Sequence, residues 1–282
     1  MAWLRREWQA MLLALQFLTR LPLPRAVAQA AFDPRSLNQA ARHFALVGAI
    51  VGAAGAIVAL LAVRLWPPAV AATLALAFTV WLTAAFHEDG LADTFDALLG
   101  AAPREKALAI MKDSRIGSYG AAVLVLSLLL RVLLLAELLR LQPWLAAAAL
   151  VVAHTAGRAC AVLLMASLPY AGDEAHAKAK PLARSVRAAD AAWALLTAVA
   201  MFTLACAACH GFGAFDTFGG SASDARLLAL ALAWAAALAL LVALMRAWLR
   251  RRLAGFTGDT LGACEQLAEI VSLLVFAAVF SA

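Results

Sequence analysis

Four carboxylates fall within nine positions of residues 87–96, which read His-Glu-Asp-Gly-Leu-Ala-Asp-Thr-Phe-Asp. If this segment is helical, Asp89, Asp93 and Asp96 lie at i, i+4 and i+7 and share one stripe of the helix. A stripe of like charges repels itself unless a cation binds to it, and carboxylate oxygens suit Mg²⁺ or Mn²⁺. The spacing therefore predicts a divalent metal site, and the simpler alternative is a solvated acidic helix end.

A second polar segment covers residues 111–120. It places Lys112, Asp113 and Arg115 among hydroxyl side chains and glycines. Glycines flanked by cations can bind phosphate through backbone N–H groups at a helix start. The alternative is an ordinary helix N-terminus with Ser118 as its cap.

Ionisable residues also stand inside apolar runs. His154 and Arg158 share one helical face at i, i+4, and Asp259 can cap a last helix on which Glu265 and Glu269 follow at the same spacing. An arginine or a glutamate within a membrane span needs a partner. We expect Arg158 to bind either a substrate phosphate or, as a structural ion pair, one of these acids.

Arg131 is a further arginine within an apolar run. Its expected partner is Glu137 or a bound lipid or phosphate, and the sequence does not choose between them.

Carboxylates together with Arg and Lys suggest phosphoryl chemistry. A metal held by the carboxylates would bind pyrophosphate oxygens and neutralise developing charge. An aspartate could deprotonate an attacking hydroxyl, while Lys112, Arg115 and Arg158 hold the phosphate. The residues alone thus predict a membrane phosphotransferase.

The elements that must position these residues are membrane helices. The chain has 282 residues, of which 65% are hydrophobic and 14% charged, with a mean hydropathy of +0.88. Soluble domains are about 45–50% apolar and about 25% charged. We predict an all-α polytopic integral membrane helical bundle, a single domain over residues 1–282. Its seven predicted spans are 43–63, 68–86, 119–139, 143–167, 190–211, 227–246 and 262–281.

The basic residues predict the orientation. Eighteen of the 23 Lys and Arg residues fall in the N-terminal segment and the even-numbered loops, and three fall on the other side. This asymmetry predicts a cytoplasmic N-terminus and an outer C-terminus. It also explains the net charge of +6 without a nucleic-acid partner. The first residues resemble a signal peptide, but a short apolar stretch followed by Arg20 and Arg25 favours an uncleaved helix in the membrane interface.

Several motifs together resemble the cobalamin synthases, the adenosylcobinamide-GDP ribazoletransferases of bacterial vitamin B12 assembly. They occur in the family's order over nearly the whole chain. The matching segments are 17–22 (Phe-Leu-Thr-Arg-Leu-Pro), 44–48 (Phe-Ala-Leu-Val-Gly), 87–96, 111–120 and 257–263 (Thr-Gly-Asp-Thr-Leu-Gly-Ala) followed by Glu265.

The resemblance implies a Mg²⁺-dependent transferase of the bacterial cytoplasmic (inner) membrane. It would join adenosylcobinamide-GDP to α-ribazole or α-ribazole 5′-phosphate, giving adenosylcobalamin or its 5′-phosphate and GMP. The sequence leaves open a homo-oligomer or an association with other enzymes of corrinoid assembly. The metal candidates are Asp89, Asp93, Asp96 and Asp113. These four and Asp259 are the catalytic candidates, and the substrate-binding candidates are Lys112, Arg115, His154, Arg158 and Glu265.

Two departures from the family pattern are expected to matter. Glu88 stands where the family usually has an apolar residue, so it either adds a ligand or faces water. Residues 172–180 carry Lys178 and Lys180 where an Arg and a Gly-rich continuation are expected, so a substrate contact made there in the family is either in doubt or taken over by these lysines.

Two rival functions are weaker. A CDP-alcohol phosphotransferase would need an Arg directly after Ala92, where this chain has Asp93. A cation or proton-coupled transporter would use the intramembrane charges as a relay, but no broken-helix pair or inverted repeat is evident, and the polar residues gather at one face.

Overall fold

The computed structural model of the protein describes residues 2–22, 38–100, 102–172, 186–213 and 220–281. Over these residues the regular structure is helical, apart from one isolated bridge between Tyr170 and Phe256. This confirms the all-α prediction. The helices are α1 (Ala2–Leu18), η2 (Ala41–His43), α4 (Phe44–Ala62), α5 (Pro68–Leu82), α6 (Phe86–Leu98), α7 (Arg104–Ile110), α8 (Ser118–Leu141), α9 (Pro143–Ser167), α10 (Ala188–Gly211), α11 (Gly220–Leu253) and α12 (Gly258–Ser281).

Six helices of the described chain are long and apolar enough to cross a membrane, and they match six of the seven predicted spans. The exception is the span predicted at 68–86. It ends early as α5, and α6 continues after a bend of 87°, so this pair is a seventh crossing only if it is counted as one broken span. The bend takes α6, and with it the acidic stripe, out of the direction of α5.

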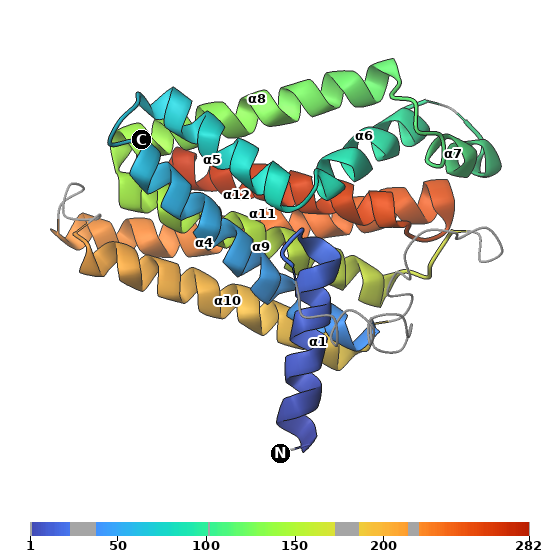
Figure 1. Cartoon of the computed structure of the whole chain (residues 1–282), viewed down its shortest axis with the longest axis horizontal. Coiled ribbons are helices and arrows are strands. Elements are labelled where there is room, and N and C mark those ends of the chain that lie inside the picture. The colour runs from blue at the N-terminus through green and yellow to red at the C-terminus, as the bar shows by residue number, and fades with distance from the viewer. Residues whose placement is uncertain (1, 23–37, 101, 173–185, 214–219, 282) are drawn as a thin grey trace.

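The spanning helices run side by side along the long axis of the molecule (Figure 1). α9 is at their centre, and 89% of its apolar stretch is buried inside the protein. The corresponding buried share of α11 is 17%. Leucine side chains on the outer helices are exposed, as expected for surfaces that contact lipid chains. They include Leu126, Leu129 and Leu133 on α8, Leu196 and Leu204 on α10, and Leu232, Leu240 and Leu244 on α11.

The two ends of the bundle differ. The C-terminus and the connection between α8 and α9 lie at one end, and α6 and α7 lie at the other (Figure 1). At this second end, Ala171 N–H donates to Phe256 O (2.8 Å) and Phe256 N–H donates to Pro169 O (2.9 Å). This pairing ties the end of α9 to the start of α12.

The first helix lies across the bundle instead of along it (Figure 1). Glu7 anchors α1 by accepting from Arg42 (2.9 Å) and by contacting His43 (3.0 Å) just before α4. Trp3 and Trp8 of α1 are exposed. Exposed tryptophans on a helix with this orientation suit the membrane–water interface, as the sequence predicts.

The N-terminus of α12 differs from the prediction. Thr257 is its cap: its hydroxyl accepts from Thr260 N–H (3.3 Å), and its own N–H donates to the Thr260 hydroxyl (2.9 Å). Asp259 therefore does not cap the helix, and its carboxylate lies in the first turn.

The bend between α5 and α6 depends on two left-handed residues. Ala84 has φ 61° and Ala85 has φ 55°, values that cost an L-residue with a Cβ about 1–2 kcal/mol. The chain is held there by Ala85 N–H donating to Val80 O (2.8 Å) and by Arg20 N–H donating to Leu82 O (2.8 Å). Strained backbone of this kind is retained where the surrounding structure requires it.

Replacing Ala85 by glycine should therefore not destabilise the protein, because glycine adopts a positive φ without the Cβ clash. We expect the free energy of unfolding in detergent to stay the same or rise by about 1 kcal/mol. Ala77→Gly, in the exposed middle of α5, is the matched control and should lower it by about 1 kcal/mol. Equal destabilisation by the two substitutions would show that the backbone at Ala85 is not strained.

Candidate functional site

Three carboxylates meet where α6 packs against the start of α12. Asp89 and Asp93 come from α6, and Asp259 comes from the first turn of α12. Gly90 permits this approach, because a Cβ at that position would lie 2.8 Å from Asp259 O. None of the three carboxylates forms an ion pair with a residue that the structure describes.

The pKa of Asp93 reflects the closeness of these carboxylates. Partial burial, followed by the negative charges of Asp89, Asp259 and Asp96, raises the pKa of Asp93 to about 7. Uncompensated negative charge on hard oxygen ligands is what a divalent cation would relieve. The residues present therefore fit a Mg²⁺ ion held by Asp89, Asp93 and Asp259.

Asp96, the third residue of the predicted stripe, has a structural contact. Its carboxylate accepts from the backbone N–H groups of Gly117 (2.6 Å) and Gly120 (2.8 Å) at the start of α8. The alternative in which Ser118 caps α8 is thus wrong, because a carboxylate from α6 satisfies these donors instead. The contact also brings residues 111–120 beside the acidic helix.

The charged residues of this segment lie at the surface. Arg115 donates to both Asp113 oxygens, with 2.6 Å between Arg115 Nη2 and Asp113 Oδ2. These bonds lower the pKa of Asp113 to about 2. Lys112 is also exposed. Among the described residues, no ion pair connects this segment to the carboxylates of Asp89, Asp93 and Asp259. The other lysines that the sequence singled out, Lys178 and Lys180, lie outside the described part of the chain.

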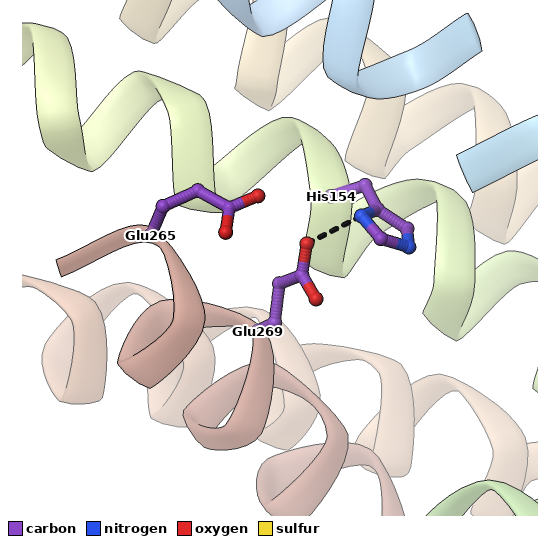
Figure 2. Close-up of side chains that lie close together, drawn as sticks. All are labelled: His154, Glu265 and Glu269. Carbon is purple, nitrogen blue, oxygen red and sulfur yellow. Dashed lines mark ion pairs between the residues drawn. The ribbon is translucent and has the colours of Figure 1, made fainter. Parts of the chain in front are cut away.

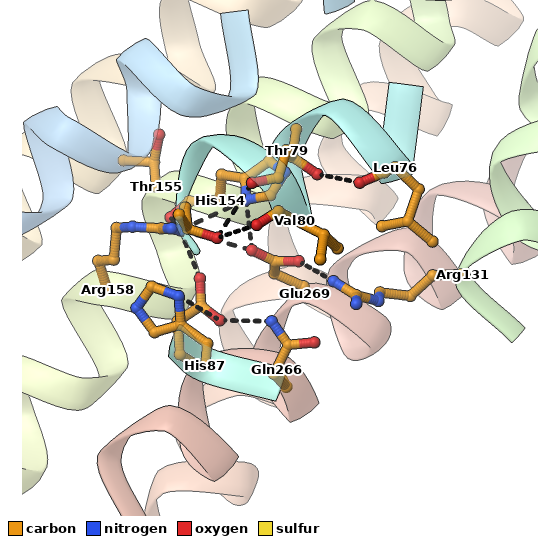
Figure 3. Close-up of polar contacts among 12 residues, drawn as sticks. Leu76, Thr79, Val80, His87, Arg131, His154, Thr155, Arg158, Gln266 and Glu269 are labelled. Carbon is orange, nitrogen blue, oxygen red and sulfur yellow. Dashed lines mark hydrogen bonds and ion pairs between the residues drawn. The ribbon is translucent and has the colours of Figure 1, made fainter. Parts of the chain in front are cut away.

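A buried ion network joins the helices that carry these carboxylates to α8 and α9 (Figure 3). Arg158 of α9 pairs with Glu265 of α12 and contacts Glu269 at 3.4 Å, as the sequence predicts. His154 also pairs with Glu269. Gly157 allows α12 to approach α9 here, because its Cβ would lie 2.9 Å from Glu265 O.

The same network includes the unassigned arginine of α8. Arg131 pairs with Glu269 (2.7 Å) and with Glu88 (3.0 Å). Glu137 is not its partner, because Glu137 pairs with Arg140 at the exposed end of α8. Glu88 does not face water either, since it is 6% exposed.

Three side chains of the network resemble a metal site. His154, Glu265 and Glu269 have ligand atoms within 4.8 Å of one another, and Figure 2 shows the three side chains together. A guanidinium already contacts both carboxylates, however, and the other arginine supplies a second positive charge. Glu265 and Glu269 both have partners inside the protein, since Arg158 contacts both of them and His154 and Arg131 contact Glu269. We assign these residues to an ion network, not to a metal.

The sequence did not indicate the open cleft beside Asp89. The cleft, ≈ 1000 Å³ of open space, lies between the end of α1 and the bend after α5, and its walls include Gln16, Arg20 and Thr83. A smaller, mainly apolar pocket nearby is lined by Phe17, Phe86, Arg158 and Glu265, among others. No local pattern marks either cavity, because each is built from segments far apart in the chain.

Removal of Arg131 tests the ion network. Arg131→Met should lower the free energy of unfolding by about 3–5 kcal/mol, because Glu88 is left as an unpaired buried charge. Arg131→Met combined with Glu88→Gln should lose less, because that charge is then absent. Denaturant unfolding in detergent measures both, with Arg140→Met on the same helix as an exposed control that should change little. The pairing would be ruled out if the double variant lost as much free energy of unfolding as Arg131→Met and Glu88→Gln lose separately, added together.

Comparisons with known proteins agree with the sequence motifs. Residues 10–277 match the family model described as cobalamin-5-phosphate synthase. An adenosylcobinamide-GDP ribazoletransferase of Leptothrix cholodnii is 48% identical over 97% of this chain and 97% of its own. One from Albidiferax ferrireducens is 43% identical (93% and 95%), and one from Shewanella amazonensis is 40% identical (100% and 99%). No solved structure matches. The chain therefore belongs to the cobalamin-5-phosphate synthase family.

Proposed function

We propose that this protein has the activity for which its relatives are named and transfers the cobinamide phosphate of adenosylcobinamide-GDP to α-ribazole or α-ribazole 5′-phosphate. The products are adenosylcobalamin or its 5′-phosphate and GMP. The observation that supports this proposal is the group of three carboxylates, Asp89, Asp93 and Asp259, which have no ion-pair partner among the described residues, together with the open cleft that Asp89 lines.

Asp89, Asp93 and Asp259 would hold Mg²⁺, which when bound would neutralise charge on the diphosphate and on the leaving GMP. Asp96 and Asp113 remain predicted ligands with weaker support. The oxygens of Asp96 already accept two backbone hydrogen bonds, and those of Asp113 accept a guanidinium.

In the proposed reaction, a ribazole hydroxyl attacks the phosphorus that bears the corrinoid arm. A new P–O bond forms, the bond to the GMP oxygen breaks, and the hydroxyl proton passes to a carboxylate. Asp113 is a poor acceptor for this proton, because a pKa of about 2 makes it a weak base at neutral pH. One of Asp89, Asp93 and Asp259 is the better candidate, since no described side chain is ion-paired with any of the three.

The proposed site faces the cytoplasm. The end of the bundle that carries α6 and α7 also carries the basic connection between these helices and α8, and the arginine-rich last turn of α11, where Arg252 donates to Gly100 O. Basic residues of this kind favour the cytoplasmic side of the inner membrane. Soluble nucleotide substrates would reach the carboxylates from that side. The N-terminus would then be cytoplasmic and the C-terminus would lie on the outer side.

Turnover by the purified protein in lipid tests the activity and its metal dependence. With adenosylcobinamide-GDP, α-ribazole and Mg²⁺, we expect GMP and cobalamin in equal amounts, and no product in EDTA. Asp89→Asn and Asp93→Asn should each lower kcat/KM at least about 100-fold, because several kcal/mol of charge stabilisation are lost.

Glu137→Gln is the matched control, since it also removes one negative charge but lies in an exposed pair at the other end of α8. It should retain full activity. Binding of Mn²⁺, followed by its electron paramagnetic resonance signal, should weaken in the two aspartate variants and not in the control. Wild-type turnover that persists in EDTA would exclude the metal, and an inactive, folded wild type would exclude the substrates.

A further inference from the structure

The cleft beside Asp89 is built by the N-terminal helix. One wall is the end of α1 with Gln16, followed by Thr19 and Arg20 just after the helix, and the other is the bend after α5, with Thr83 to Phe86. Arg20 N–H donates to Leu82 O (2.8 Å), and the Phe17 ring packs edge-on against Phe86 with centroids 5.6 Å apart. The two walls are therefore fixed relative to each other.

Two polar groups at this cleft have no partner in the described part of the protein. Arg20 is exposed, and its guanidinium takes part in no ion pair or hydrogen bond to a described residue. Gln16 Oε1 is shielded from solvent and accepts no hydrogen bond from a described residue. Other arginines at this end of the molecule are already bonded to protein oxygens, among them Arg104, Arg115, Arg187 and Arg252.

The charges around the cleft are complementary to a metal-bound phosphate. Asp89 supplies a negative group on the α6 side, and Arg20 supplies a positive one on the α1 side. A carboxylate alone would repel a phosphate, whereas a guanidinium can bind two of its oxygens at once. A cation held by Asp89 and the Arg20 guanidinium could thus contact the same anionic ligand from two sides.

We propose that Arg20 binds a substrate phosphate in this cleft and that Gln16 accepts a hydrogen bond from a hydroxyl of the same substrate. α1 is then a wall of the substrate site as well as a helix that contacts the membrane interface. The identity of the phosphate rests on the proposed function: it belongs either to the diphosphate of the donor or to the 5′-phosphate of the acceptor.

Kinetics of Arg20→Ala distinguish these two sources. If Arg20 binds the acceptor phosphate, KM for α-ribazole 5′-phosphate rises roughly 10- to 100-fold, and KM for free α-ribazole stays unchanged. If Arg20 binds the donor, KM for adenosylcobinamide-GDP rises by a similar factor with either acceptor. Arg20→Lys keeps the charge but loses the planar pair of donors, and should lie between Arg20→Ala and the wild type.

Arg5→Ala is the matched control, because Arg5 is an exposed arginine of α1, the helix that leads to Arg20, and does not line the cleft. It should leave every KM unchanged. The proposal is overturned if all KM values of Arg20→Ala stay within about twofold of an active wild type, or if Arg5→Ala changes them equally.

A second measurement uses the wild-type protein and does not depend on turnover. Phenylglyoxal modifies exposed guanidiniums, and mass spectrometry follows each arginine separately. With Mg²⁺ present, α-ribazole 5′-phosphate or GDP should slow the modification of Arg20 at least fivefold and leave that of Arg5 unchanged. Equal rates with and without these ligands would overturn the phosphate site even if the enzyme is active. Protection in an inactive wild type would retain the site and reject only the proposed reaction.

Discussion

The interaction on which the rest of the structure depends is the buried pairing of Arg131 and Arg158 with three glutamates. A charge that faces lipid or packed helices has no water to return to, so each of these groups requires its partner. The pairs connect α6, α8, α9 and α12. Because lipid chains are as apolar as leucine, the spanning helices gain little from hydrophobic burial against each other. Ion pairs and close approach at small residues such as Gly157 therefore determine which helices are neighbours.

This network also sets the rotation of the acidic helix. Glu88 points into the protein toward Arg131, and the next residue, Asp89, lies at the open cleft. Rotation of α6 about its axis would break the Glu88 pair before it moved Asp89 far. The contact between Asp96 and the start of α8 restrains the same helix at its other end. The carboxylates of the proposed site are thus held by interactions that they do not themselves make.

Sequence reasoning succeeded where the information is local. Hydropathy located six spans, and the rarity of charges in apolar runs identified Arg158 as a partner for the acids of the last helix. It failed where the contact joins distant segments. Arg131 and Glu88 are 43 positions apart, and no sequence pattern connects them, so the nearer Glu137 was predicted as a partner instead. The bend within the span predicted at 68–86 could not be predicted from the sequence, because Ala84 and Ala85 are not residue types that favour a left-handed backbone.

The acidic stripe shows why regular spacing does not assign equal roles. Asp89, Asp93 and Asp96 follow one helical face, yet α6 passes three different neighbours along its length: the cleft, the start of α12 and the start of α8. A carboxylate beside unsatisfied N–H groups caps a helix, and one beside other carboxylates retains unbalanced charge. Only the second kind has a reason to bind a cation. The three aspartates therefore differ in role because the tertiary packing places different groups beside them: free backbone N–H groups beside Asp96 and other carboxylates beside Asp93.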